Sequence, residues 1–305
     1  MLNNQITQAD QWMLDAALCA GEKAEQAWRA WRATLDFDQV GPRYLPLIPL
    51  LQQNLVRLGI QDPLIGKFKG IQRQVLYKNQ LLLHQARDLI QVWQAAGIAA
   101  ICLTDIALAA HYHADLSLRP IRAFQFLLRP PQVTAASHWL QQKGWRPEDR
   151  IQRPHFKRFI NAAGFKIDLH LHLFPPRLYA GNADLFWAAS MAIRIQDVTT
   201  YALNPTVQLL ALCTQPPQKH FAHLLWIADA LTLLRHSQVE IDWARLYRAD
   251  LSAQLRLRLS IALHDLAERY DAPIPAVVLH FLATAHPLVR KLPRPILRLL
   301  FTYLT

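Results

Sequence analysis

Hydrophobic residues recur at helical spacing through the first third of the 305-residue chain. The apolar positions predict one helix over residues 8–35, a second over 47–58 and a third, much longer, over 64–96, because side chains three or four residues apart lie on one face of a helix. Gly97 follows the longest stretch directly, as is typical of a helix C-terminus. We therefore expect residues 1–97 to form an N-terminal helical region.

Strands and helices alternate in the middle of the chain. Short strands are predicted over residues 98–103 and 123–128, and a hairpin over residues 155–160 and 164–173. In the last of these strands apolar and polar side chains alternate, which is typical of a strand with one buried face. The polar row consists of Lys166, Asp168, His170 and His172. A binding or catalytic site would lie along this row.

The pattern becomes helical again after the Pro175-Pro176 pair. Helices are expected over residues 182–191, 204–214, 219–235, 242–250, 252–270, 275–285 and 295–304. The chain is thereby divided into the N-terminal helical region, an α/β core over residues 98–175 and a C-terminal helical region over residues 176–305. We predict an α+β fold in which a small mixed sheet is surrounded by a large, mainly helical part.

Composition places the chain among compact proteins of a reducing compartment. Hydrophobic residues make up 52% and charged residues 18%, which supports a sizeable core and argues against disorder. The cysteines Cys19, Cys102 and Cys213 lie far apart among apolar residues, as buried thiols do. The N-terminus lacks the pattern of a signal peptide, and no apolar run approaches the ~20 residues of a membrane span. We expect a cytoplasmic protein without a transmembrane segment.

Positive charge is unevenly distributed. The formal net charge is +11, and residues 119–166 hold ten Lys or Arg against only Glu148 and Asp149. A basic block of this kind suits a polyanion such as a nucleotide or RNA. The alternative is a solvated basic surface without a partner.

Residues 99–129 carry the most informative motif. Leu103-Thr104-Asp105 ends the first predicted strand, Arg119-Pro120 closes a loop, and the second strand begins at Ala123. The segment resembles the active-site segment of a bacterial family of polymerase-beta-like nucleotidyltransferases, usually described as uncharacterised. In that family the first strand ends in Leu-Lys-Gly, and an Arg-Pro pair precedes a strand reading Asp-Ile-Asp. The resemblance implies a nucleotidyltransferase-like core.

Other motifs extend the resemblance over most of residues 10–280. They are Gly144-Trp145, the Asp-Leu-His of residues 168–170, Trp226–Asp229 and Ile241–Trp243, and their order and spacing fit the family. Asp229 lies on an otherwise apolar predicted helix, so we interpret it as a structural acid with a hydrogen-bond partner.

Both aspartates of the family's second strand are replaced, by Ala123 and Gln125. Sites of this kind hold two magnesium ions between carboxylates and nucleotide phosphates. Ala123 offers no ligand and Gln125 only a neutral amide, so Asp168 would remain as the single carboxylate. We therefore expect the standard two-metal catalysis to be lost, with no cofactor unless magnesium serves a still active enzyme.

Each surviving candidate has a functional and a structural interpretation. Asp168 is a metal-binding or general-base carboxylate, or else a structural acid paired with an arginine such as Arg119. Arg119 is a residue whose fork-shaped guanidinium donates hydrogen bonds to phosphate, or else it is the ion-pair partner of Asp115. Thr104 and His170 complete the candidate nucleotide- and phosphate-binding set, although Thr104 or Asp105 is also a good N-cap.

A transition-metal site is a further alternative. Asp168, His170 and His172 share one face of the predicted strand, and imidazole suits zinc. Three functions remain open on this evidence. The chain is a nucleotidyltransferase-family protein that has lost catalysis and binds a nucleotide, RNA or protein partner; a divergent active enzyme that transfers a nucleotidyl group to a small molecule, protein or RNA; or a structural or accessory protein with a closed cleft.

Overall fold

The computed structural model describes residues 6–34, 40–148, 155–175, 179, 184–214, 224–248 and 251–284. The helix expected over residues 295–304 lies outside this part of the chain. All statements below concern the described residues.

The N-terminal region is helical, as predicted, but its first helix is divided. The elements are α1 (Gln8–Leu18), α2 (Gly21–Ala33), the 3-10 turn η2 (Leu45–Leu47), α3 (Ile48–Arg57) and α4 (Leu64–Ala95). The single helix expected over residues 8–35 is wrong, because the chain turns at Gly21, whose φ of 58° lies in the left-handed region that glycine adopts without strain. The end of α4 before Gly97, at φ 71°, confirms the predicted C-terminus.

The sheet has seven strands and mixed direction. They are β1 (Ala100–Cys102), β2 (Phe124–Leu128), β3 (Arg146–Pro147), β4 (Phe156–Ile160), β5 (Lys166–His170), β6 (Ser190–Ile195) and β7 (Val198–Leu203). Their order is β3-β4-β5-β2-β1-β7-β6. The pairs β2–β5 and β1–β7 are parallel, and the other neighbours are antiparallel. The predicted strands and the β4–β5 hairpin are confirmed.

The hairpin β6–β7 corrects the expectation that the chain is purely helical after residue 175. The helix predicted over residues 182–191 shortens to α7 (Asp184–Ala188), and the chain then enters β6. β7 pairs with β1, so this hairpin belongs to the central sheet. Its turn, Gln196-Asp197, places Gln196 at φ 55° and contains no glycine, so only Asp197 offers a turn signal there.

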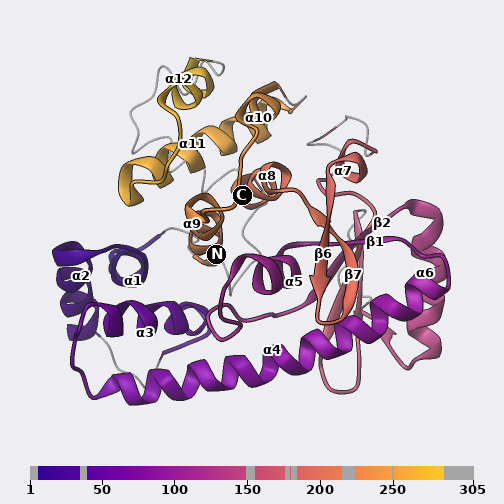
Figure 1. Cartoon of the computed structure of the whole chain (residues 1–305), viewed down its shortest axis with the longest axis horizontal. Coiled ribbons are helices and arrows are strands. Elements are labelled where there is room, and N and C mark those ends of the chain that lie inside the picture. Colours follow the sequence, from indigo (N-terminus) through magenta and orange to yellow (C-terminus); the bar gives the residue numbers. More distant parts are fainter. Residues whose placement is uncertain are drawn as a thin grey trace.

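The remaining helices flank the sheet. They are α5 (Thr104–Ala107), its π-helical continuation η3 (Leu108–Tyr112), α6 (Pro130–Gln142), α8 (Pro205–Thr214), α9 (Leu225–Arg235), α10 (Trp243–Arg248), α11 (Ala253–Tyr270) and α12 (Ala276–Thr284). In Figure 1, α4 runs through the lower part of the molecule, below α3 at one end and across the sheet at the other. This arrangement confirms the α+β fold, with a mixed sheet in a mainly helical surround.

The two faces of the sheet bury different side chains. Phe124, Phe126 and Leu169 pack toward α4 and α6, with Trp93 at 5.1 Å from Phe126. On the opposite face Ile101 and Leu127 join the core formed with α1–α3, α8 and α9. Odd-numbered residues of β2 and even-numbered residues of β5 point to this second face, because strand side chains alternate. The candidate residues Gln125 and Asp168 therefore lie on the face away from α4.

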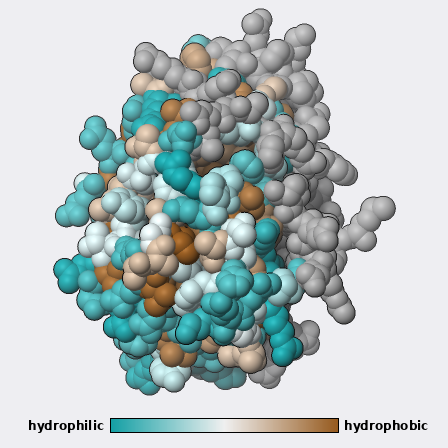
Figure 2. All heavy atoms as spheres, turned by 90° about the vertical axis from the view of Figure 1, so that its right-hand side faces the viewer, coloured by the Kyte–Doolittle hydropathy of each residue, from teal (hydrophilic) through white to brown (hydrophobic). Residues whose placement is uncertain are grey.

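The surface and the thiols agree with the composition. The three cysteines, Cys19, Cys102 and Cys213, are buried free thiols, as predicted. The side of the molecule that carries α6 is mainly hydrophilic, with small hydrophobic areas between polar side chains (Figure 2). Within the described part of the chain, no helix has both the length and the apolar composition to cross a membrane.

Candidate functional site

The sheet brings the predicted candidates together at adjacent strands. Gln125 of β2 is the register partner of Asp168 of β5, and Asp168 is also opposite Arg158 of β4. Gln125 is 8% exposed and Asp168 is fully buried. The position that would carry the second family aspartate thus lies directly beside the surviving carboxylate, as the resemblance implies.

Arg158 occupies both oxygens of Asp168. Arg158 Nε donates to Asp168 Oδ1 at 2.6 Å, and Nη2 donates to Oδ2 at 2.8 Å. Such a two-pronged pair between charged groups is the strongest common form of protein hydrogen bond. The hydrogen bond to Asp168 raises the pKa of Arg158, which keeps the guanidinium charged. The structural alternative for Asp168 named Arg119 as the partner; the partner is Arg158.

Gln125 is also held by a protein group. Thr104 Oγ1 donates to Gln125 Oε1, and the Gln125 carbonyl accepts from the Leu103 backbone N–H at 2.8 Å. Thr104 does not cap α5: Leu103 is the N-cap residue and no side chain makes a cap hydrogen bond. The amide oxygen that could have served as a metal ligand is therefore turned toward a hydroxyl group.

Arg119 lies at the centre of a second, separate cluster and is 1% exposed. Its Nη2 contacts Asp105 at 2.7 Å and Asp229 at 2.9 Å, while Nε donates to Asp229 at 3.0 Å. Asp229 is on α9, so this pair connects the α/β core to the C-terminal helices. The prediction that Asp229 is a structural acid is confirmed. The Asp115 pairing proposed for Arg119 is wrong, since Arg119 is paired with Asp105 and Asp229.

Asp105 is satisfied by two arginines. Arg122 adds its backbone N–H at 3.0 Å and two guanidinium donors at 2.9 and 3.1 Å to the contact from Arg119. Burial raises the pKa of Asp105, but the two guanidinium groups outweigh burial and hold the pKa well below its usual value. Asp105 therefore stays ionised and acts as an anchor for the loop, not as an N-cap.

The Arg119-Pro120 loop is also fixed to α4. Asn79 donates to the carbonyls of Leu116 at 2.6 Å and Arg119 at 2.7 Å, and it accepts from the Ile121 N–H at 2.9 Å. These bonds position the Arg119 backbone while the two aspartates position its side chain. The guanidinium Nη1 donates to the Pro120 carbonyl at 3.0 Å, so all three guanidinium nitrogens are bonded to groups of the protein itself.

His170 is a buried neutral ring. It is stacked on Phe156 with centroids 5.1 Å apart, and neither ring nitrogen has a hydrogen-bond partner in the described part of the structure. Burial lowers the pKa of His170 to about 4. Within the described residues no group of three His, Cys, Asp or Glu side chains is arranged to hold a metal ion, so the suggested set of Asp168, His170 and His172 is not brought together.

His172 lies at a different place, beside a cavity of about 270 Å³ at the carboxyl ends of β2 and β5. This cavity is bordered by Arg129 and Trp187, whose guanidinium carbon and ring centroid are 4.7 Å apart. Arg129 also pairs with Asp184 at 2.6 Å.

Part of the basic block of residues 119–166 is engaged in ion pairs within the protein. Four of its ten cations are paired with described carboxylates, namely Arg119, Arg122, Arg129 and Arg158. Lys143, Arg146 and Lys157 are exposed, and Arg150 and Arg153 lie outside the described residues. The block is therefore a weaker candidate for a polyanion surface than its charge count indicates.

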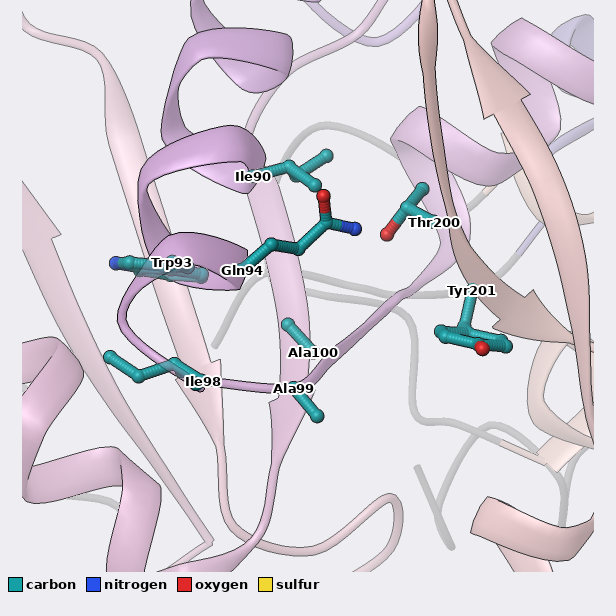
Figure 3. A pocket seen from close by; sticks show the side chains of 9 residues that line it. Ile90, Trp93, Gln94, Ile98, Ala99, Ala100, Thr200 and Tyr201 are labelled. Carbon is teal, nitrogen blue, oxygen red and sulfur yellow. The ribbon is translucent and has the colours of Figure 1, made fainter.

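A further cavity of about 250 Å³ lies on the face of the sheet that packs against α4. Figure 3 shows Ile90 and Gln94 of α4 on one side and Thr200 and Tyr201 of β7 on the other. The Gln94 side chain donates to the Thr199 carbonyl at 2.8 Å. The lining is mainly apolar, and this cavity is on the opposite face from Asp168.

Comparison with known proteins assigns the family. The model of a family described as uncharacterised nucleotidyltransferase matches residues 43–271, more than half of the chain. The chain belongs to this nucleotidyltransferase family. No curated protein matches the chain.

Two solved structures are similar to this family member. One is a lincosamide antibiotic adenylyltransferase with lincomycin bound, at 11% identity and a TM-score of 0.39, covering 50% of this chain and 97% of that one. The other is an antigenic nucleotidyltransferase-like protein from Paracoccidioides brasiliensis, at 13% identity and a TM-score of 0.43, covering 65% and 96%.

Proposed function

We propose that this nucleotidyltransferase-family protein has lost the two-metal transfer reaction and acts by binding an anionic partner. The observation that carries the first part is the pairing of Asp168 with Arg158. The one carboxylate left at the expected metal position directs both oxygens at a guanidinium, 2.6 and 2.8 Å away. A permanent internal cation thus takes the place where a metal ion would be needed.

The donor set does not fit magnesium. Mg²⁺ requires near-octahedral oxygen ligands and is normally held by one or two carboxylates together with substrate phosphates. Ala123 supplies no oxygen, Gln125 is bonded to Thr104, and Asp168 would have to release Arg158. Removing a partner from a buried ion pair costs about 3–5 kcal/mol, so metal binding here would be strongly opposed.

Phosphate binding by the expected residues is opposed in the same way. Arg119 is buried between two carboxylates, and Asp105 stands where a Lys-Gly turn would favour phosphate. A nucleotide at this site would meet paired arginines and an ionised aspartate. These contacts support the view that the former cleft now serves the fold.

Net charge supports the second part of the proposal. The chain carries 33 Lys and Arg against 22 Asp and Glu. A protein with this excess attracts polyanions over distances of about 10 Å at moderate salt. We therefore propose a nucleotide-containing polymer as the partner class, bound on the surface outside the former cleft.

A labelling experiment tests the loss of transfer. The purified protein is incubated with labelled nucleoside triphosphates, Mg²⁺ or Mn²⁺, and cell extract, beside the Asp168→Asn variant. We expect no label transfer above background from either protein. Transfer by the wild-type chain that Asp168→Asn abolishes would contradict the proposal and favour the divergent active enzyme.

A further inference from the structure

The exposed side of the N-terminal half of α4 combines cations, glycines and one aromatic ring. Residues 64–87 contain no acid, and the helix has none in its first turn. Its exposed side chains include Lys67, Lys69, Arg73 and Lys78, together with Tyr77, which is 69% exposed. Gly66 and Gly70 lie on the same exposed side. We call these seven residues the α4 basic strip.

Helical geometry orders the strip into a lane. At about 100° per residue, Gly66, Gly70 and Tyr77 fall within about 40° of one another around the axis. On one side of this line lie Lys69 and Arg73, and on the other lie Lys67 and Lys78. The opposite face of the helix buries Phe68, Val75 and Asn79. The strip is therefore a lane of two glycines and one aromatic ring, about 16 Å long, with cations on both sides.

The glycines have no packing role within the chain. A Cβ added at Gly66 or Gly70 would meet nothing within 4 Å, and neither residue has a positive φ. Glycine inside a helix is about 1 kcal/mol less favourable than alanine. Neither packing nor backbone conformation within the chain explains these two helix-destabilising glycines. They would instead allow another molecule to approach the helix backbone closely.

The first turn of α4, at one end of the strip, contains no acid, although acids are favoured near a helix N-terminus by the macrodipole. None of the described carboxylates forms an ion pair with Lys69, Arg73 or Lys78. These three cations therefore carry a positive potential that no described carboxylate compensates and that an external anion would relieve.

We infer that the α4 basic strip binds the phosphate backbone of single-stranded RNA. The lane length of about 16 Å corresponds to four or five phosphates at the roughly 3.4 Å spacing of a stacked strand. The lysines and Arg73 contact phosphates on both sides, the glycines let the backbone approach, and Tyr77 offers a ring for base stacking. This inference rests on the part of the proposed function that assigns an anionic partner, and not on the loss of transfer.

Two other occupants fit less well. A membrane surface needs large apolar side chains on the helix, whereas α4 turns its apolar face inward. A second copy packed glycine to glycine would bring the two sets of cations into contact, and like charges repel. Single-stranded nucleic acid satisfies both the charge and the exposed ring.

The test is the anisotropy of a fluorescein-labelled oligouridine RNA titrated with the full-length protein at about 50 and 200 mM KCl. Lys69→Gln/Arg73→Gln removes two exposed cations, and Lys143→Gln/Lys157→Gln is the charge-matched control from the basic block. We expect the strip variant to bind at least tenfold more weakly at low salt. Its salt slope should fall by about 1.4, at about 0.7 for each lost phosphate contact. The control should keep wild-type affinity.

A second variant separates binding from folding. Gly66→Gln/Gly70→Gln fills the lane with neutral side chains that favour helix, so the melting temperature should rise while RNA affinity falls at least threefold. Unchanged RNA affinity in this variant would contradict the claim that RNA binds along the lane.

The other results are also decisive. An equal loss of RNA affinity in the Lys143/Lys157 control would show that RNA does not bind specifically at the strip. That result would contradict the inference but would still support an anionic partner. The inference is overturned if the wild-type protein does not bind RNA, or if it binds phosphatidylserine vesicles instead. It is also overturned if light scattering shows a dimer that Gly66→Gln/Gly70→Gln dissociates. None of these results bears on label transfer.

Discussion

Two arginines paired with buried aspartates lie within 40 positions of each other, and they differ in what they connect. Arg119 joins Asp105 of α5 to Asp229 of α9, so it ties together elements 14 and 110 positions away. Arg158 joins β4 to the adjacent β5 through Asp168, ten positions away. The guanidinium of Arg119 is 1% exposed and that of Arg158 is 13% exposed.

Arg119 therefore stabilises the packing of distant elements, whereas Arg158 neutralises a carboxylate within one sheet. The Arg119 cluster holds the α/β core against the C-terminal helices, and its loss would expose two buried carboxylates. The Arg158 pair holds two strands that are already hydrogen-bonded to each other. Under the proposed function its consequence is chemical, because it neutralises the carboxylate that a metal-dependent transfer would need.

The largest expected effect is from Arg119→Leu. The change leaves Asp229 buried without its partner and removes one of the two arginines from Asp105. We expect the free energy of unfolding to fall by about 3–5 kcal/mol in urea denaturation. The exposed pair partner Arg129, changed to Gln, serves as the control and should lose no more than about 1 kcal/mol. Similar losses in both variants would remove the distinction between a buried anchor and a surface pair.

Arg158→Met should be less damaging, by about 2–3 kcal/mol, because water has some access to Asp168 once the guanidinium is gone. The double variant Arg158→Met/Asp168→Leu sharpens the comparison. Replacing both members of a buried pair with apolar groups of similar size is often close to neutral, so stability should return toward the wild-type value. A double variant no more stable than Arg158→Met would show that Asp168 has another structural role.

A pH dependence should mark the Arg158 side of the molecule. Burial lowers the pKa of His170 to about 4, against about 6.5 in the unfolded chain, while Asp168, Arg158 and His155 face the ring. The unfolded state then binds more protons between these values, so stability is full above about pH 6.5 and falls toward pH 4.

His170 should therefore contribute a loss of about 2 kcal/mol between pH 7 and pH 4.5 in urea denaturation. His170→Phe removes this contribution, while the half-buried His113, whose pKa burial also lowers to about 4, keeps its own contribution. An unchanged pH dependence in His170→Phe would mean that the ring has the same pKa in the folded protein as in the unfolded chain.

The smallest effect should come from Thr104→Val. The change removes the hydroxyl that donates a hydrogen bond to Gln125 Oε1, and it leaves this amide oxygen without that donor. We expect a loss of about 1 kcal/mol in thermal or urea unfolding. Thr34→Val is the comparison, because the hydroxyl of this exposed residue donates to the Trp31 carbonyl and touches no acceptor of the candidate site. An effect at Thr104 well below that at Thr34 would show that Gln125 finds another donor.

Sequence patterns predicted the residues of the site better than their partners. The alternation in β5 placed Asp168 and His170 on one face, and the family resemblance placed Gln125 beside them. Arg158 was missed because its opposition to Asp168 depends on strand register, which the turn around residues 161–164 sets. Asp229 was recognised as structural, but its partner lies 110 positions earlier, and no local pattern encodes that distance.

The fold shows the same limit. Long periodic segments such as α4 were predicted nearly to the residue, since burial and periodicity agree there. The β6–β7 hairpin was missed because its strands are short and its turn uses Gln196, a residue without turn preference. Gly21 carried the signal for the break between α1 and α2, but the continuous apolar pattern around it outweighed one glycine.

Manganese titration tests the central claim most directly. Free Mn²⁺ is followed by electron paramagnetic resonance as the protein is added, with and without a non-hydrolysable nucleoside triphosphate, for the wild-type chain and Asp168→Asn. If Arg158 has replaced the metal ion, both proteins leave the free Mn²⁺ signal equally unchanged at millimolar metal. Wild-type binding that Asp168→Asn removes would show that the carboxylate still serves a metal site and would contradict the account.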